Sequence, residues 1–322
     1  MSPIEHLSCH LIQSLAKVAP EKAAELQELL DKHHIRFILD KQSPYMVFAA
    51  CHQTKTITVG LLALERLWAR AFAYVSLYDF LTNRLPGNPK PLDIKLDDPE
   101  IKPAMELLAW AVEVERRLVE GGVGDLPWPA DLPRPCRDAG RGSFENAADE
   151  LMLCTIASIL HHEVGHIERN HHPQTLPRPA SKSELKDDQN IQIAEVAQLL
   201  WEKEADAWSA NWLLEGLDEK DDRFLKRALG IALGYLWIAS RDIHTGCVVR
   251  AHHPPAWDRL YQNIKQHIPN SPSHPIWMFV AYVLLLHLTS IEEVPPDAEY
   301  QTPEDLVNQL LDHVSRLNDR PK

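Results

Sequence analysis

Hydrophobic positions recur with helical spacing along most of the chain beyond residue 60. Between residues 61 and 78, apolar side chains form one stripe with the 3.6-residue period of an amphipathic helix. The same kind of pattern predicts further helices over residues 2–17, 21–33, 100–120, 144–171, 190–216, 220–241, 255–268, 274–290 and 303–318. The chain is therefore expected to be mostly helical.

Residues 35–59 follow a different pattern. Three short runs rich in β-branched and aromatic residues, 35–39, 45–50 and 54–59, are separated by turn-forming residues. Such runs are typical of short neighbouring strands, so we expect a small antiparallel β-meander. Together with the helices, this predicts an α+β fold that is mostly α.

The segment 121–142 is rich in glycine and proline and predicts a long loop. Long loops in compact domains are often functional, and we expect this one to cover a cleft. It is also the best candidate boundary between an N-terminal region, residues 1–142, and a C-terminal region, residues 143–322. The two regions can also form a single folding unit.

Composition narrows the class of protein. The 322 residues include 46 acidic and 33 basic side chains, a net charge of -13, and a surface of this sign repels phosphate backbones, which excludes nucleic acid as a general partner. The five cysteines form no CxxC pair and no leader peptide is evident, which favours a cytoplasmic protein. The longest apolar run, 276–286, is shorter than the roughly 20 residues of a spanning helix. We therefore expect no membrane insertion.

Histidine is unusually frequent, with 17 residues, and imidazole is the commonest metal ligand in proteins. An HExxH motif occupies residues 162–166 of a predicted helix. His162 and His166 are four residues apart, so both imidazoles lie on one helix face and can bind one zinc ion. Glu163 lies beside the first ligand, where it can act as a general base toward the water that zinc activates. The motif therefore predicts a catalytic zinc site.

The third zinc ligand has three candidates. His172 has the spacing of a longer motif that ends in a third histidine, but Arg169 stands where that motif requires glycine. Glu202 and Asp206 share one face of the next helix, so Glu202 can bind zinc while Asp206 holds the outer nitrogen of a ligand histidine. Helical periodicity favours Glu204 instead, because it falls nearer the centre of the apolar stripe. We favour Glu202.

Three segments together resemble the gluzincin metallopeptidases. The first is the HExxH helix, with His171 five residues after the second ligand, and the second is residues 202–210. The third, residues 253–259, is similar to the HPxxxxR element of the HtpX and CAAX-endopeptidase group. The resemblance implies a zincin-like helical catalytic core in the C-terminal region, with Glu202 as a zinc ligand and Asp206 supporting the site.

The lack of a convincing membrane helix favours soluble relatives of that group. In size and in its long N-terminal part, the chain resembles the Lit family of phage-exclusion proteases. This resemblance implies a zinc-dependent endopeptidase that cuts a cytosolic protein as antiviral defence. The alternative function is a non-catalytic, zinc-stabilised scaffold for protein interactions.

The third segment suggests one further catalytic residue. Pro254 and Pro255 suit the first turn of a helix, so His253 would lie at its start and could donate a hydrogen bond to a developing oxyanion. We expect Arg259 to form a structural ion pair. A protein substrate is expected to pair as an added strand with an edge of the sheet at 35–59.

Overall fold

The computed structural model describes residues 2–5, 11–42, 48–84, 97–121, 126–136, 138–171, 187–245, 255–268, 270–293 and 300–318. The strands are β1 (Arg36–Asp40), β2 (Phe48–Cys51) and β3 (Thr56–Gly60). The helices are α2 (Leu11–Val18), the 3-10 turn η1 (Pro20–Lys22), α3 (Ala23–His33), α4 (Leu61–Arg84), α5 (Lys102–Val119), α6 (Phe144–Glu168), α7 (Asp187–Leu214), α8 (Asp222–Thr245), α9 (Ala256–His267), α10 (Pro275–Ser290) and α11 (Pro303–Asn318). This confirms an α+β fold that is mostly α.

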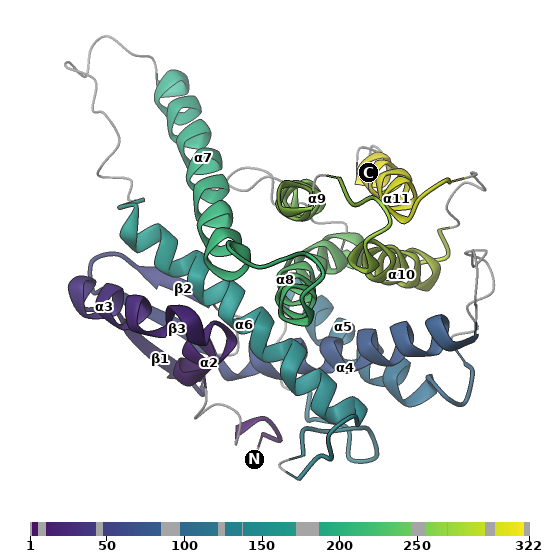
Figure 1. Ribbon diagram of the computed structural model, residues 1–322. Helices are drawn as coiled ribbons and strands as arrows, with labels where there is room; N and C mark the ends of the chain where they lie inside the picture. The colour runs from purple at the N-terminus through teal and green to yellow at the C-terminus, as the bar shows by residue number, and fades with distance from the viewer. Residues whose placement is uncertain are drawn as a thin grey trace.

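Helix α6 is the central element (Figure 1). It begins after Ser143, whose hydroxyl accepts a hydrogen bond of 3.2 Å from the backbone N–H of Asn146 and so caps the helix. Buried side chains occur around most of its circumference, because α2, α4, β2, α7 and α8 all pack against it. Elements on both sides of the candidate boundary at residue 142 therefore share this one helix.

Helices α6 and α8 approach each other closely at Gly230. A Cβ atom at Gly230 would lie 2.5 Å from the Cβ atom and 2.7 Å from the carbonyl carbon of Cys154. At Gly234, one turn later, the nearest side-chain atom is at an ordinary 3.7 Å, in Thr155. The missing side chain at Gly230 is what lets α8 lie directly against α6, and this close crossing leads into the cleft described below.

The strand order corrects the predicted antiparallel meander. The sheet has the order β1-β3-β2, in which β1 pairs with β3 in parallel and β2 pairs with β3 antiparallel. The predicted neighbours β1 and β2 are both edge strands. Four of the five residues of β3 are buried, whereas every residue of β1 and β2 is exposed or half-buried. This difference in burial favours β3 as the central strand.

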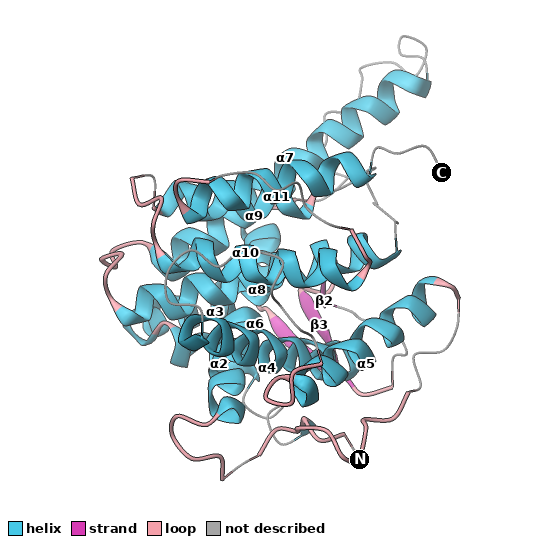
Figure 2. Cartoon of the chain, turned by 90° about the vertical axis from the view of Figure 1, so that its right-hand side faces the viewer, coloured by secondary structure: helices cyan, strands magenta, loops and turns pink. Residues whose placement is uncertain are grey.

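The most apolar helix, α10, is part of the core. Its side chains from Ile276 to Leu288 are nearly all buried. Within the ranges given above, no helix is both long enough and apolar enough to cross a membrane. Helix α7 differs from the others, because it projects beyond the packed body of helices (Figures 1 and 2).

Candidate metal centre

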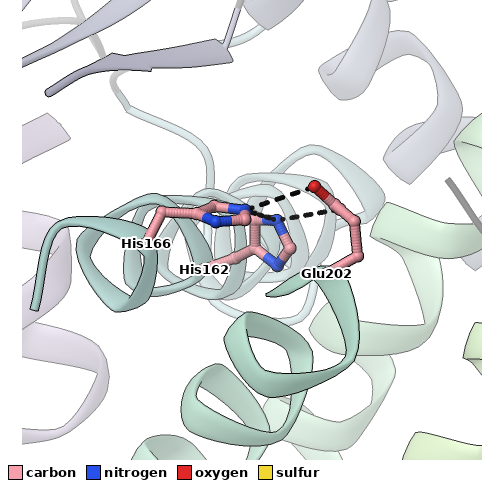
Figure 3. A group of neighbouring side chains, drawn as sticks. All are labelled: His162, His166 and Glu202. Atoms are coloured by element: carbon pink, nitrogen blue, oxygen red, sulfur yellow. Dashed lines mark hydrogen bonds and ion pairs between the residues drawn. The ribbon is translucent and has the colours of Figure 1, made fainter. Parts of the chain in front are cut away.

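The end of α6 and the middle of α7 bring together two histidines and one glutamate (Figure 3). His162 and His166 lie one turn apart on α6, and Glu202 reaches them from α7. The two Nε2 atoms are 3.0 Å apart, and the Glu202 carboxylate oxygens lie 3.5 Å from Nε2 of His162 and 3.4 Å from Nε2 of His166. One ligand atom from each residue falls within 4.8 Å of the others, a grouping that could hold a metal ion.

A buried ion pair orients the first histidine. The Nδ1 atom of His162 lies 2.8 Å from Oδ1 of Asp206. Arg259 donates two hydrogen bonds of 2.7 Å to the same carboxylate and lies 3.2 Å from Glu202. Burial would raise the pKa of Asp206, but Arg259 and His162 outweigh that effect and lower it to about 2. Asp206 is therefore ionised and accepts the Nδ1 proton of His162.

This arrangement suits a cation. Because His162 donates from Nδ1, a neutral ring presents the Nε2 lone pair to the cluster, next to the Nε2 atom of His166 at 3.0 Å. Burial lowers the pKa of His162, but Asp206 and Glu202 outweigh it and raise the pKa to about 10. The electrostatic field that attracts a proton at this point also attracts a metal ion. Two imidazole nitrogens and a carboxylate are a ligand set typical of catalytic zinc sites.

Glu163 lies at the same end of α6. One carboxylate oxygen, Oε2, accepts a hydrogen bond of 2.8 Å from the backbone N–H of Ala50 in β2. Burial raises the pKa of Glu163 and outweighs the opposing effect of His162, and the Glu202 charge raises it further. A carboxylate with a raised pKa is a better proton acceptor, which is the property required of a general base.

A cleft of about 600 Å³ opens over these residues. Its walls come from β2, α6, α7 and α8, and they include apolar side chains such as Phe48, Ile159 and Trp237 next to the polar cluster. The ring of Phe48 meets that of Trp237 edge to face at 5.9 Å, which links β2 to α8 across the cleft. The edge strand β2 therefore forms one side of the cleft.

The described part of the Gly/Pro-rich loop lies away from the cleft, which corrects for these residues the expectation that the loop covers it. In its described part, Trp128 packs against Trp110 of α5 and Trp68 of α4, at 4.9 Å and 5.7 Å between ring centres. Trp68 in turn donates a hydrogen bond of 2.6 Å to Asp149 near the start of α6, whereas the cleft lies at the end of that helix. Burial of its indole against two others explains the position of this loop.

The two candidate glutamates occupy different environments. The Glu202 side chain is 11% exposed and faces both histidines, whereas the Glu204 side chain is 58% exposed. Glu204 instead accepts a hydrogen bond of 2.9 Å from Nε2 of His171. Apolar periodicity favours Glu204 because Glu204 shares a helix face with Val196 and Leu200, but both of these side chains are exposed, so this face does not point into the protein.

The contacts of two residues in the site, Ala50 and His171, could not be predicted from the sequence. The Ala50 N–H has no side-chain signature, so only the tertiary structure reveals its bond to Glu163. His171 was noted for its spacing, but its contacts with His166 and Glu204 depend on how the chain leaves α6. The proposed oxyanion donor His253 and the alternative ligand His172 lie outside the described residues.

Comparison with known proteins adds information on the family. The model of the family described as Peptidase U49 matches residues 57–280, a span that contains His162, Glu163, His166 and Glu202. The chain is also 26% identical over 320 residues to the protein named cell death peptidase from Escherichia coli strain K12, covering 98% of each chain. No solved structure matches the chain. These findings agree with the peptidase resemblance carried by the three sequence motifs.

Proposed function

The chain belongs to the Peptidase U49 family and is therefore a protease that acts on proteins or peptides; from this premise, we propose that it is a zinc-dependent endopeptidase. One observation carries the proposal: two imidazole nitrogens and a carboxylate converge at the end of α6, beside a second carboxylate in a cleft. His162, His166 and Glu202 would hold the zinc ion, and Asp206 would fix the orientation of His162.

In the proposed reaction, zinc and the side chains of the protein would perform different tasks. Zinc with three protein ligands supplies an open coordination position and Lewis-acid polarisation of a water molecule and of the scissile carbonyl. Glu163 takes a proton from the attacking water at its carboxylate and later passes it to the nitrogen of the leaving amine. The Ala50 N–H holds one oxygen of Glu163, which leaves the other oxygen for the proton transfer. His253 remains our proposal for the oxyanion donor.

The substrate would bind as an extended segment along β2. This strand pairs with β3 on one side only, and the Ala50 N–H points away from β3 into the cleft. In an antiparallel pair, alternate residues direct both backbone groups outward. Phe48 and the carbonyl oxygen of Ala50 would therefore present groups for an added strand, while the Ala50 N–H holds Glu163. The apolar wall of the cleft would receive the substrate side chains.

The biological role that we propose follows the resemblance to phage-exclusion proteases. The relative from Escherichia coli carries the name cell death peptidase. We propose that the present protein acts in the cytoplasm, cutting a cytosolic protein as part of antiviral defence. Such a protease would remain inactive until infection.

The decisive variant is Glu163→Gln, which keeps the shape of the side chain but removes its basicity. We expect the purified wild-type protein and the variant to bind one zinc ion each, and only wild type to create new peptide termini in a proteome-wide search in phage-infected cells. Glu150→Gln is the matched control, because Glu150 lies on the same helix and pairs with Lys226 at the surface. Undiminished cleavage by zinc-loaded Glu163→Gln would exclude Glu163 as the base, and full activity of metal-free protein would exclude the zinc mechanism.

A further inference from the structure

We propose that His171 is a positioning residue that fixes the tautomer and orientation of His166, with Glu204 as its own support. The inference rests on the zinc site proposed above. It assigns a defined task to a histidine outside the ligand set. Asp206 fixes the tautomer and orientation of His162 through its contact with Nδ1. His166 needs an equivalent partner if both rings are to present Nε2 to one ion.

The end of α6 places His171 behind His166. Asn170 adopts a left-handed conformation with φ of 55°, which turns the chain back on itself. The backbone N–H of His171 then donates a hydrogen bond of 3.0 Å to the carbonyl oxygen of His166. The His171 ring stacks on Trp201 of α7, with ring centres 5.6 Å apart and planes 11° from parallel. The side chain is 2% exposed, so backbone and aromatic contacts hold the ring in one position.

The hydrogen bonds define one consistent set of protons. Nδ1 of His166 lies 3.0 Å from Nδ1 of His171, so one of these atoms must donate and the other accept. A metal ion at Nε2 of His166 requires the proton of that ring to be on Nδ1. His171 therefore accepts at Nδ1 and carries its own proton on Nε2. That proton points to Oε2 of Glu204, which lies 2.9 Å away.

The resulting hydrogen-bonded chain, Glu204–His171–His166, would orient a ligand histidine as Asp206 orients His162, but it contains different groups. A carboxylate acts directly on His162, whereas a neutral imidazole lies between the carboxylate and His166. The Glu204 side chain is largely solvated, so it contributes less than a buried carboxylate would. The imidazole of His171 is the component that His166 contacts, and we expect its acceptor nitrogen to matter most.

Three substitutions at His171 separate positioning from packing. His171→Asn keeps an acceptor oxygen close to the place of Nδ1, whereas His171→Gln keeps a donor close to the place of Nε2 and loses that acceptor. His171→Ala removes both groups. The measurement is zinc affinity of the whole purified chain, by competition with a chromophoric chelator, with the absorption spectrum of the cobalt-substituted protein as a second readout of ligand geometry.

We expect zinc affinity to fall by about 10- to 100-fold in His171→Ala, the usual effect of losing a partner of a metal-bound histidine. His171→Gln should behave like His171→Ala, and His171→Asn should recover most of the affinity and the wild-type cobalt spectrum. Lys203→Ala, an exposed neighbour on α7, serves as the matched control and should retain wild-type affinity.

Equal zinc affinity in wild type and His171→Gln would overturn the assignment of His171, even if His171→Ala does not fold. A uniform loss in all three folded variants would also overturn it, because it would show that His171 only packs against Trp201. A wild-type protein that binds no zinc would overturn the proposed function as well. The failure of the inference is therefore distinct from the failure of the zinc site on which it rests.

Discussion

Two groups of histidines lie in contact in this protein, and they differ in nearly every other respect. At the end of α6, His162 and His166 approach within 3.0 Å through their Nε2 atoms. Between α8 and α10, Nε2 of His244 lies 3.0 Å from Nδ1 of His287. The distances are the same, yet the first group lines a cleft and faces carboxylates, whereas no ion pair with a carboxylate is seen for the second group among the described residues.

The second group is built as part of the core. His287 is 1% exposed, and its Nε2 atom lies 2.6 Å from the Tyr74 hydroxyl. Burial lowers the pKa of His287 well below its usual value, with contributions from His244 and Arg70, and burial lowers the pKa of His244 to about 4. Both rings are therefore neutral. The comparison teaches that carboxylates and access to solvent, rather than close imidazoles, distinguish a metal site.

The largest expected effect comes from a substitution of Glu202, which tests whether its carboxylate is needed for metal binding. Glu202→Ala should weaken zinc binding by more than about 100-fold, beyond the range for an outer partner, and reduce peptidase activity to background. The matched variant is Glu204→Ala, only two residues away on α7. It should weaken zinc binding by about tenfold or less, since Glu204 is solvated and acts through His171.

Metal content of the purified variants and calorimetric titration with zinc measure both effects. The reverse order, with Glu204→Ala the more damaging variant, would mean that the exposed carboxylate binds the metal. In that case, the carboxylate of Glu202 would no longer distinguish the first histidine group from the second.

The close approach of the two candidate histidine ligands could be predicted from the sequence because it depends on local geometry. A spacing of four residues places His162 and His166 on one helix face, whatever surrounds them. The third ligand required a choice between Glu202 and Glu204 that periodicity alone would have made differently. The roles of Ala50 and His171 could not be predicted, because they depend on the packing of β2 and on the chain direction after Asn170.

The fold shows the same division between local and tertiary information. Most helices lie where the apolar periodicity predicts them, and each of the three strands overlaps a predicted run and ends one residue beyond it. Their order could not be predicted, since a two-residue alternation identifies a strand but not its neighbours. The position of the described part of the 121–142 loop also depends on distant partners, because Trp128 finds its contacts on α4 and α5.

A smaller effect concerns pH and the buried histidines. In the unfolded chain His287 titrates near its usual pKa of about 6.5, whereas burial keeps it neutral in the fold. Its contribution to stability is thus complete above about pH 6.5 and is lost as the pH falls, at about 1.4 kcal/mol per pH unit. Between about pH 6.5 and 5, we expect the free energy of unfolding to fall by about 2 kcal/mol from this residue.

The variant His287→Gln isolates the pH-dependent contribution of His287 to the free energy of unfolding, because glutamine keeps a polar group near Tyr74 but does not titrate. Urea unfolding of wild type and variant at several pH values gives two profiles, and their difference contains the contribution of His287. We expect the variant to lose about 2 kcal/mol less than wild type over this interval. Parallel profiles would show that His287 is accessible to protons in the folded protein, and the contrast between the two groups would be lost.

The smallest expected effect concerns the hydroxyl that holds the second group. Tyr74→Phe removes the partner of His287 and leaves a buried ring nitrogen without a hydrogen bond, which should reduce the free energy of unfolding by about 1–3 kcal/mol. Tyr78→Phe is the matched control one turn along α4, because its ring packs on Phe279 but its hydroxyl has no hydrogen-bond partner among the described residues. Urea unfolding should therefore place Tyr78→Phe within about 0.5 kcal/mol of wild type.

Zinc affinity should be unchanged in both variants, because the Tyr74–His287 pair packs in the core away from the cleft. A loss of zinc binding in Tyr74→Phe would instead mean that the two histidine groups are energetically coupled, and the second could no longer be regarded as part of the core alone.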